Sequence, residues 1–297
     1  MRGGALKHWA LACASLAIAG PAWATPTPGG INFQTPATQV ARNVMNFHNE
    51  VLIIIAAITV FVTALLIWVM IRYNKRANPT PRKFSHNTLV EILWTVVPVL
   101  ILVYIAYKSF PLLYEQDVMP TQIELADGST RPLTEDEVVD IKVYGHQWYW
   151  RYIYGEGDNA TEVESRIVPT ESLKPGQIPL LSVDNPMVAP AHRHVRLSIT
   201  AQDVIHAWAM PQFAIKVDAV PGRLNQLWFN AEEPGIYYGQ CSELCGANHA
   251  FMPIELRILP QAQYDEWLRR VQTSASEARA YLDQVQPQTG SQVAAAQ

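Results

Sequence analysis

Two long apolar stretches stand out in the hydrophobic pattern of the N-terminal part of the chain. Residues 51–71 carry no charged side chain, and a second stretch covers residues 88–108 with Pro98 in its interior. About 20 apolar helical residues cross a bilayer, and a membrane helix tolerates a kinking proline. The pattern therefore predicts a transmembrane hairpin with helices over residues 47–72 and 88–110, rather than buried helices of a globular core.

Beyond this hairpin the apolar positions fall into short segments rich in Val, Ile, Tyr, Phe and Trp. Turn signals such as Lys174-Pro175-Gly176, Pro221-Gly222 and Pro234-Gly235 separate them. Strands at this spacing are typical of an all-β sandwich or barrel, which we expect over residues 111–260. The expected strands cover residues 138–145, 147–154, 194–200, 214–218, 223–230, 235–239 and 254–259.

A helical period replaces the strand pattern near the C-terminus. Tyr264, Trp267 and Val271 recur at helical spacing, so residues 261–285 are predicted to form one C-terminal helix. The last residues, 286–297, are rich in Gln, Ala and Ser and are expected to be disordered.

The first residues have the pattern of an export signal. Arg2 and Lys7 precede a short apolar run, and Ala22-Trp23-Ala24 supplies small residues where a signal peptidase cleaves. We expect residues 1–24 to be removed, since this run is too short to span a bilayer. An uncleaved anchor is the alternative, and lipid attachment at Cys13 is a weaker one.

The loop between the two apolar stretches sets the expected orientation. It covers residues 73–87 and, with Arg72 at its edge, is basic and free of acidic side chains. Short basic loops stay in the cytoplasm, so both termini, the segment 25–46 and the β domain are expected outside. The basic residues are Arg72, Lys75, Arg76, Arg82 and Lys83.

Charge separates the outer domain from the rest of the chain. The 297 residues have a net charge of −4, but from residue 112 onward 24 acidic side chains face only 13 basic ones. An acidic surface argues against nucleic acid and favours a basic partner steered by long-range attraction. Ordinary solubility explains the charge equally well.

A short loop concentrates side chains that bind metals. Cys241, Cys245, His249 and Met252 offer two thiols, an imidazole and a thioether within a few turns of chain. A disulfide would leave the flanking His and Met without a role, and Met is a poor zinc ligand. A single blue copper uses one Cys, two His and a weak Met, which leaves one Cys too many. The second Cys would instead bridge two coppers.

A two-copper site still needs a second histidine. The best candidate is His206 in "TAQDVIHAWAMP", although a lone histidine is more often a core residue. His192 and His194 compete for this role, but they lie beside Arg193 and Arg196 and are typical of a solvated strand face.

Four motifs together resemble one family. "LVEILWTVVP", "YGHQWYWRY", "DVIHAWAMPQFAIKVDAVPGRLNQ" and "YYGQCSELCGANHAFMPIE" are similar, in this order, to subunit II of bacterial cytochrome c oxidases. The resemblance covers nearly all of residues 40–260. It implies a two-helix membrane hairpin followed by a cupredoxin-like sandwich in the periplasm, anchored in the bacterial inner membrane.

The resemblance implies a dinuclear copper centre, CuA, in this sandwich. Cys241 and Cys245 would bridge both coppers, with His206 and His249 each binding one. Met252 and the backbone carbonyl of Glu243 would be weak ligands. The Glu243 carboxylate would bind a magnesium ion at the boundary with subunit I, although a solvent-facing acid is the simpler explanation from sequence alone.

The resemblance also implies where the electron donor, cytochrome c, docks. The electron would enter at Trp148, which on a strand shares a face with Trp150. Asp203 matches a docking acid of the family, and Glu162 and Asp184 are further matches. Related chains often carry Glu where this sequence has Ile153, so one docking charge is missing.

Proton uptake is the last role that the resemblance implies. Glu91 and His86 match the entrance of a proton channel leading into subunit I, on the cytoplasmic side. The alternative for Glu91 is that it is simply an acid in the first turn of a helix, where the helix dipole stabilises it. Haem binding and oxygen reduction would belong to subunit I, with subunit III a further partner.

Other functions fit the sequence less well. A nitrous oxide reductase has a similar Cys-Cys-His-Met loop but is disfavoured by the two-helix hairpin and by Glu91. A quinol oxidase subunit would lack the copper ligands that are present here. A redox-inert assembly factor with a disulfide is the weakest alternative.

Overall fold

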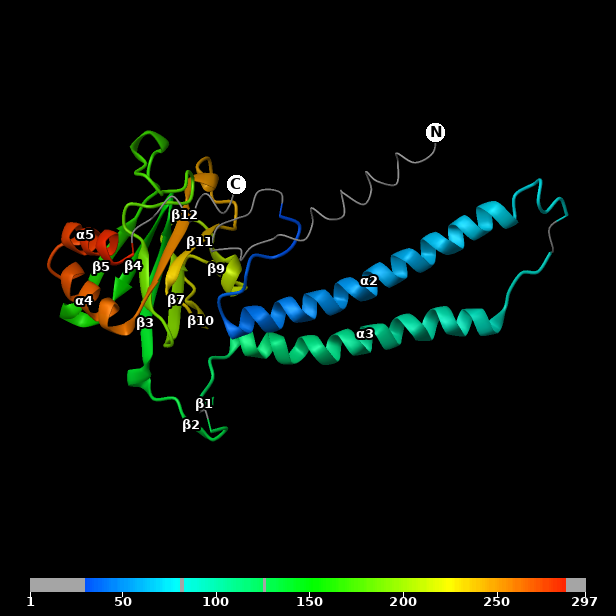
Figure 1. Ribbon diagram of the computed structural model, residues 1–297, viewed down its shortest axis with the longest axis horizontal. Coiled ribbons are helices and arrows are strands. Elements are labelled where there is room, and N and C mark those ends of the chain that lie inside the picture. Colours follow the sequence, from blue (N-terminus) through cyan, green and yellow to red (C-terminus); the bar gives the residue numbers. More distant parts are fainter. Residues whose placement is uncertain (1–29, 81–82, 125–126, 287–297) are drawn as a thin grey trace, which may run out of the picture. The chain divides into compact units, whose positions relative to one another are not determined.

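The computed structural model describes residues 30–80, 83–124 and 127–286. The expected export signal, Cys13 and all but the first residue of the expected tail lie outside these ranges. The described chain divides into a helical hairpin, residues 39–120, and a β unit formed by residues 30–38 and 121–286 (Figure 1).

The hairpin consists of α2 (Gln39–Arg72) and α3 (Thr88–Asp117), both long and apolar enough to cross a membrane. Asn87 caps α3, because its side chain accepts hydrogen bonds from the amides of Leu89 and Val90. Both helices continue beyond the predicted apolar spans, α2 from residue 39 and α3 to residue 117. Backbone hydrogen bonding extends a helix past the bilayer, so hydropathy alone underestimates its length.

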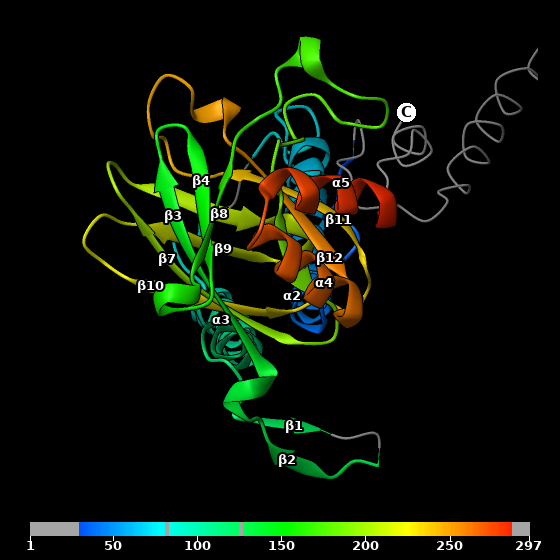
Figure 2. The ribbon, with the colours of Figure 1, turned by 90° about the vertical axis from the view of Figure 1, so that its left-hand side faces the viewer.

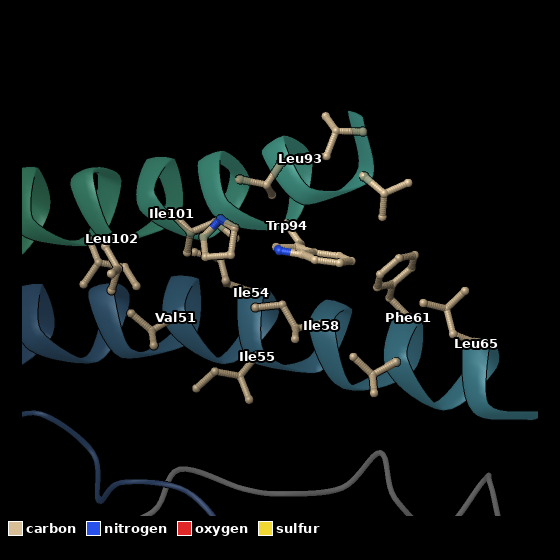
Figure 3. A pocket seen from close by; sticks show the side chains of 15 residues that line it. Val51, Ile54, Ile55, Ile58, Phe61, Leu65, Leu93, Trp94, Ile101 and Leu102 are labelled. Atoms are coloured by element: carbon tan, nitrogen blue, oxygen red, sulfur yellow. The ribbon is translucent and has the colours of Figure 1, made fainter. Parts of the chain in front are cut away.

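Polar and apolar contacts join the two helices at different levels. Near one end, Glu50 accepts a hydrogen bond from the Tyr104 hydroxyl at 2.9 Å and pairs with Lys108 at 3.4 Å. Along the middle, apolar side chains of both helices, among them Ile54 and Trp94, line an open pocket (Figure 3). The hydrophobic surface that these helices leave exposed is suited to lipid or to other membrane helices.

Two five-stranded sheets form the predicted sandwich (Figure 2). The pairs β3–β7 and β6–β12 are parallel, and the other pairs are antiparallel. The first sheet has the order β10 (Asn225–Asn230), β7 (His194–Ala201), β3 (Val138–His146), β4 (Tyr149–Tyr154), β5 (Thr161–Ser165). The second has the order β6 (Met187–Pro190), β12 (Pro253–Leu259), β11 (Gly235–Cys241), β8 (His206–Met210), β9 (Ile215–Ala219).

Large side chains fill the space between the sheets. Trp150 and Tyr152 of β4 and Trp208 of β8 are fully buried. In β7 buried and half-buried positions alternate, as expected for a strand with one face on the core. Burial of this much aromatic surface makes the sandwich a rigid support for the loops at its ends.

Five strands were not predicted. In β8 all five residues are buried, and β6 is buried throughout, so neither has the alternation that identifies a strand. The third, β5, is a short strand next to β4. The last two, β1 (Gln122–Glu124) and β2 (Thr130–Pro132), form a separate hairpin of three-residue strands.

The predicted single C-terminal helix is wrong in one respect, because the chain forms two helices, α4 (Gln261–Val271) and α5 (Ala275–Val285). Ser274 starts α5 as its N-cap and accepts a hydrogen bond from the Glu277 amide at 3.4 Å. Trp267 of α4 packs edge-to-face on Tyr154, with ring centroids 5.0 Å apart. The two helices therefore cover part of the sandwich.

Candidate metal centre

Two neighbouring strands bring the distant histidine to the cysteine loop. β8 begins at His206 and β11 ends at Cys241, and the two strands pair antiparallel, with Cys241 opposite Trp208. The loop that leaves β11 carries Cys245 and His249 and joins β12 directly after Met252. Sheet register, rather than sequence proximity, therefore places His206 at the site.

Six possible ligand atoms converge at the end of the sandwich where β8 begins and β11 ends. The Cys241 sulfur lies 3.9 Å from the Cys245 sulfur, 3.9 Å from Nδ1 of His206 and 3.4 Å from the carbonyl oxygen of Glu243. The Cys245 sulfur lies 3.5 Å from Nδ1 of His249 and 4.0 Å from the Met252 sulfur. All the ligands expected from the sequence are thus brought together.

Two alternatives raised by the sequence find no support in this geometry. The cysteines are free, with their sulfurs far beyond the ~2.05 Å of a disulfide bond. His192 is exposed, and His194 stacks on Trp228 with ring centroids 5.7 Å apart. His206, by contrast, is fully buried and belongs to the cluster with both cysteines.

The electrostatics of the two thiols favour a shared cation. Burial opposes ionisation of Cys241, but hydrogen bonds from His206 and backbone amides prevail and lower its pKa. Burial and the charge of Cys241 together raise the pKa of Cys245. If a metal ion binds and both thiols ionise, its positive charge offsets the repulsion between the two thiolates. Soft sulfur donors with imidazoles favour copper or zinc, and the thioether of Met252 favours copper, because Met is a poor zinc ligand.

Asp203 supports His206 from behind the ligand cluster. Its Oδ1 lies 2.8 Å from Nε2 of His206, and it also accepts hydrogen bonds from the amides of Val204 and Gln147, both at 2.7 Å. Burial opposes ionisation, but these hydrogen bonds lower the pKa of the Asp203 carboxyl. A carboxylate in this position fixes the orientation of a ligating imidazole. The sequence indicated a docking acid here and missed this contact.

The expected position of Trp148 needs a correction. β4 begins at Tyr149, so Gln147 and Trp148 form the turn after β3 and Trp148 does not share a strand face with Trp150. Trp150 is a core residue whose ring lies 6.0 Å from that of His206. Trp148 is half-buried and remains partly accessible at the edge of the site.

The other two expected docking acids lie on the β unit in different surroundings. Glu162 of β5 is exposed, pairs with Arg151 at 3.4 Å and lies opposite Ile153 in the sheet. Asp184 is engaged with backbone, because its Oδ1 accepts hydrogen bonds from the amides of Arg166 and Asn185, both at 2.7 Å. Glu162 is therefore the freer of the two charges.

The remaining expected residues have simple local surroundings. The Glu243 carboxylate points to Lys216, with 3.5 Å between Oε1 and Nζ, while its carbonyl faces Cys241. In the hairpin, Glu91 lies in the first turn of α3, where the helix dipole stabilises an acidic side chain. His86 precedes this helix and its Nδ1 lies 3.2 Å from the Ser85 hydroxyl.

Comparisons with known proteins match most of the chain to one family. Residues 139–259 match the family model "Cytochrome C oxidase subunit II, periplasmic domain" and residues 26–112 match the transmembrane domain of the same subunit. With the two apolar helices, the second match identifies a membrane protein with two spans.

Curated relatives give the same family. A "Probable cytochrome c oxidase subunit 2" from Rickettsia felis is 46% identical, covering 82% of this chain and 72% of the relative. A mitochondrial cytochrome c oxidase subunit 2 from Vigna unguiculata is 40% identical, covering 82% and 62%. The crystal structure of the periplasmic domain of subunit II from Bradyrhizobium japonicum shares 44% identity, covers 47% of this chain and 95% of that one, and has a TM-score of 0.42.

Proposed function

Because the chain belongs to the cytochrome c oxidase subunit II family, we propose that it takes electrons from cytochrome c at a dinuclear CuA centre and passes them to haem in subunit I. Family membership makes the chain a subunit of a membrane oxidoreductase complex. Reduction of oxygen to water and the coupled proton pumping would take place in subunit I, because this chain has no motif that resembles a haem site.

The converging ligand atoms carry this proposal. Cys241 and Cys245 would bridge the two coppers, His206 and His249 would each bind one, and Met252 and the Glu243 carbonyl would be weak ligands. When bound, two coppers that share two thiolates take up and release one electron with little change in geometry. The chain contributes a buried, rigid frame that holds the ligands before and after transfer.

An EPR spectrum of the full-length chain, purified with its partner subunits and loaded with copper, tests the copper proposal. We expect two coppers per chain and a mixed-valence signal from two equivalent ions, because two thiolates 3.9 Å apart could both be shared between the ions. A blue single-copper spectrum, or copper below two per chain after full loading, would contradict a dinuclear centre.

Trp148 is proposed as the residue where the electron enters. The position of Trp148 at the edge of the site supports this proposal. Trp148 lies in the same turn as Gln147, whose side chain donates a hydrogen bond to the Cys245 carbonyl at 2.7 Å. The acidic β unit would attract a basic cytochrome c surface, with Glu162 as the more available charge and Asp203 and Asp184 as further acids.

Glu243 is proposed to bind magnesium at the boundary with subunit I. A partly exposed carboxylate is a suitable ligand for this hard cation. Lys216 occupies the neighbourhood of the carboxylate, so the ion would have to displace this side chain or bind the opposite oxygen. The backbone carbonyl of Glu243 would face copper, so Glu243 would link the two metal sites.

The topology and targeting of the chain are also proposals. The basic loop, residues 73–87, would lie in the cytoplasm and the β unit in the periplasm of a bacterial inner membrane. Residues 1–24 would be an export signal, with residues 25–46 leading to the first span. Subunit III would complete the set of partners.

Replacing Glu91 by alanine is expected to slow oxidase turnover at least about tenfold and leave the copper EPR signal unchanged. Glu91 and His86 would admit protons to a channel in subunit I, and a positioned acid or base typically speeds proton transfer by roughly 10²–10⁴-fold. Water can partly substitute for the acid at a channel entrance, so the lowest expected loss lies below this range. Proton uptake by the reconstituted oxidase measures the effect.

The matched control for this prediction is Glu115→Ala. Glu115 lies near the other end of α3 and accepts a hydrogen bond from Asn43 at 2.8 Å. We expect this variant to keep normal turnover. Equal slowing by both variants would indicate a general effect of charge on the hairpin and would remove the channel role of Glu91.

A further inference from the structure

The turn between β3 and β4 contacts both segments that carry the copper ligands. The Gln147 backbone amide donates to Oδ2 of Asp203 at 2.7 Å, and Oδ1 of the same carboxylate lies 2.8 Å from Nε2 of His206. The Gln147 side-chain amide donates to the carbonyl oxygen of Cys245, also at 2.7 Å. A single residue therefore joins the start of β8 to the loop between β11 and β12.

Close packing fixes this turn on two sides. A Cβ atom at Gly145 would lie 2.8 Å from Cδ2 of His206, so the backbone of β3 rests directly on the imidazole. A Cβ atom at Gly246 would lie 2.9 Å from Nε2 of Gln147 and 3.1 Å from Cζ2 of Trp148. The Trp148 indole is therefore in contact with the residue that follows Cys245.

We propose that Gln147 is a positioning residue that holds Trp148, His206 and Cys245 in one fixed arrangement. Its backbone amide orients the Asp203 carboxylate that holds His206, and its side chain fixes the backbone of Cys245. Trp148 follows directly in the chain, so the same two bonds set where the indole lies. The inference rests on the proposed copper function and assigns a role to a residue that is not itself a ligand.

The physical reason is the geometric demand of a metal site. A ligating imidazole keeps its orientation through the hydrogen bond of its second nitrogen, and loss of such support typically changes metal affinity or activity. The Cys245 carbonyl oxygen belongs to the peptide group directly after Cys245. Rotation of this peptide group would move the Cys245 sulfur, which is one of the two proposed bridges. Gln147 acts on both points at once, without contact to copper.

The variant Gln147→Met tests this role in the assembled, copper-loaded oxidase. Methionine keeps the length of the side chain but cannot donate to the Cys245 carbonyl. We expect a changed copper hyperfine pattern in the EPR spectrum, a shifted reduction potential, and electron uptake from cytochrome c slowed by about three- to tenfold, the range of one hydrogen bond.

The matched control is Gln202→Met, at an exposed glutamine near the same turn whose side chain makes no hydrogen bond within the described part of the chain. It should leave the spectrum, potential and uptake rate unchanged. If Gln147→Met also leaves all three unchanged, or only lowers the melting temperature, the positioning role is overturned while the copper function stands. A wild-type oxidase without a two-copper signal would overturn both.

Discussion

Replacing Cys241 by serine is expected to abolish the two-copper EPR signal of the assembled oxidase. Turnover with cytochrome c should fall by more than the ~10–100-fold typical of losing a residue that only supports a ligand. Cys241 has the central sulfur of the site, within 3.9 Å of Cys245 and His206 and 3.4 Å from the Glu243 carbonyl. Copper content, the EPR spectrum and steady-state turnover measure the effect.

Serine fails at this position for two reasons. Its hydroxyl does not ionise near neutral pH, whereas hydrogen bonds lower the pKa of the Cys241 thiol despite its burial. Oxygen is also a harder donor than sulfur and a poorer match for copper. Neither reason concerns the packing of the sandwich, so the β unit should still fold.

Ser242→Ala is the control for this experiment, because it changes an exposed side chain at the next position. It should keep two coppers and normal turnover. A Cys241→Ser oxidase that retains the mixed-valence signal would show that the Cys241 sulfur is not a bridge. In that case the two coppers would share an electron without this sulfur, and the proposed bridging role of Cys241 would be wrong.

The proposed ligand set could be predicted from sequence because most of its members lie on one loop. Cys241, Cys245, His249 and Met252 are close in the chain, so their chemistry can be read without knowing the fold. His206 entered only as the histidine that a two-copper site needs, and by resemblance. Its place depends on the pairing of β8 with β11, which a strand without alternation does not reveal.

The overall architecture followed from length and periodicity, but its boundaries did not. The apolar runs identified both membrane helices, and short strands with turn signals identified the sandwich. The break at Ser274 depends on a local capping hydrogen bond. The turn before β4 instead makes hydrogen bonds from Gln147 to Asp203 and Cys245, which are far away in the sequence. The contact of Asp203 with His206 likewise depends on how a loop folds.

Replacing Arg257 by methionine is expected to destabilise the β unit by about 3–5 kcal/mol, the usual cost of removing one partner from a buried ion pair. Arg257 and Glu255 project from β12 and are both fully buried, with 2.9 Å between Nε and Oε1. The guanidinium also donates to the Gln286 carbonyl at 3.3 Å, at the end of α5. Methionine would leave the carboxylate of Glu255 buried without this cation.

Two further variants separate this cost from a general packing defect. The double variant Glu255→Leu with Arg257→Met should recover much of the lost stability, because apolar replacement of a whole buried pair is often neutral or stabilising. Arg269→Met breaks the exposed pair with Glu266, 2.7 Å apart, and should cost no more than about 1 kcal/mol.

Denaturation of the full-length chain in detergent, followed by tryptophan fluorescence, would measure all three variants. β12 starts directly after Met252, so the strand that carries the pair also anchors one end of the ligand loop. We therefore expect Arg257→Met to lose copper at a lower temperature than the wild type. If the double variant is as unstable as Arg257→Met, the loss comes from packing around β12, and removal of the Arg257 charge is not its cause.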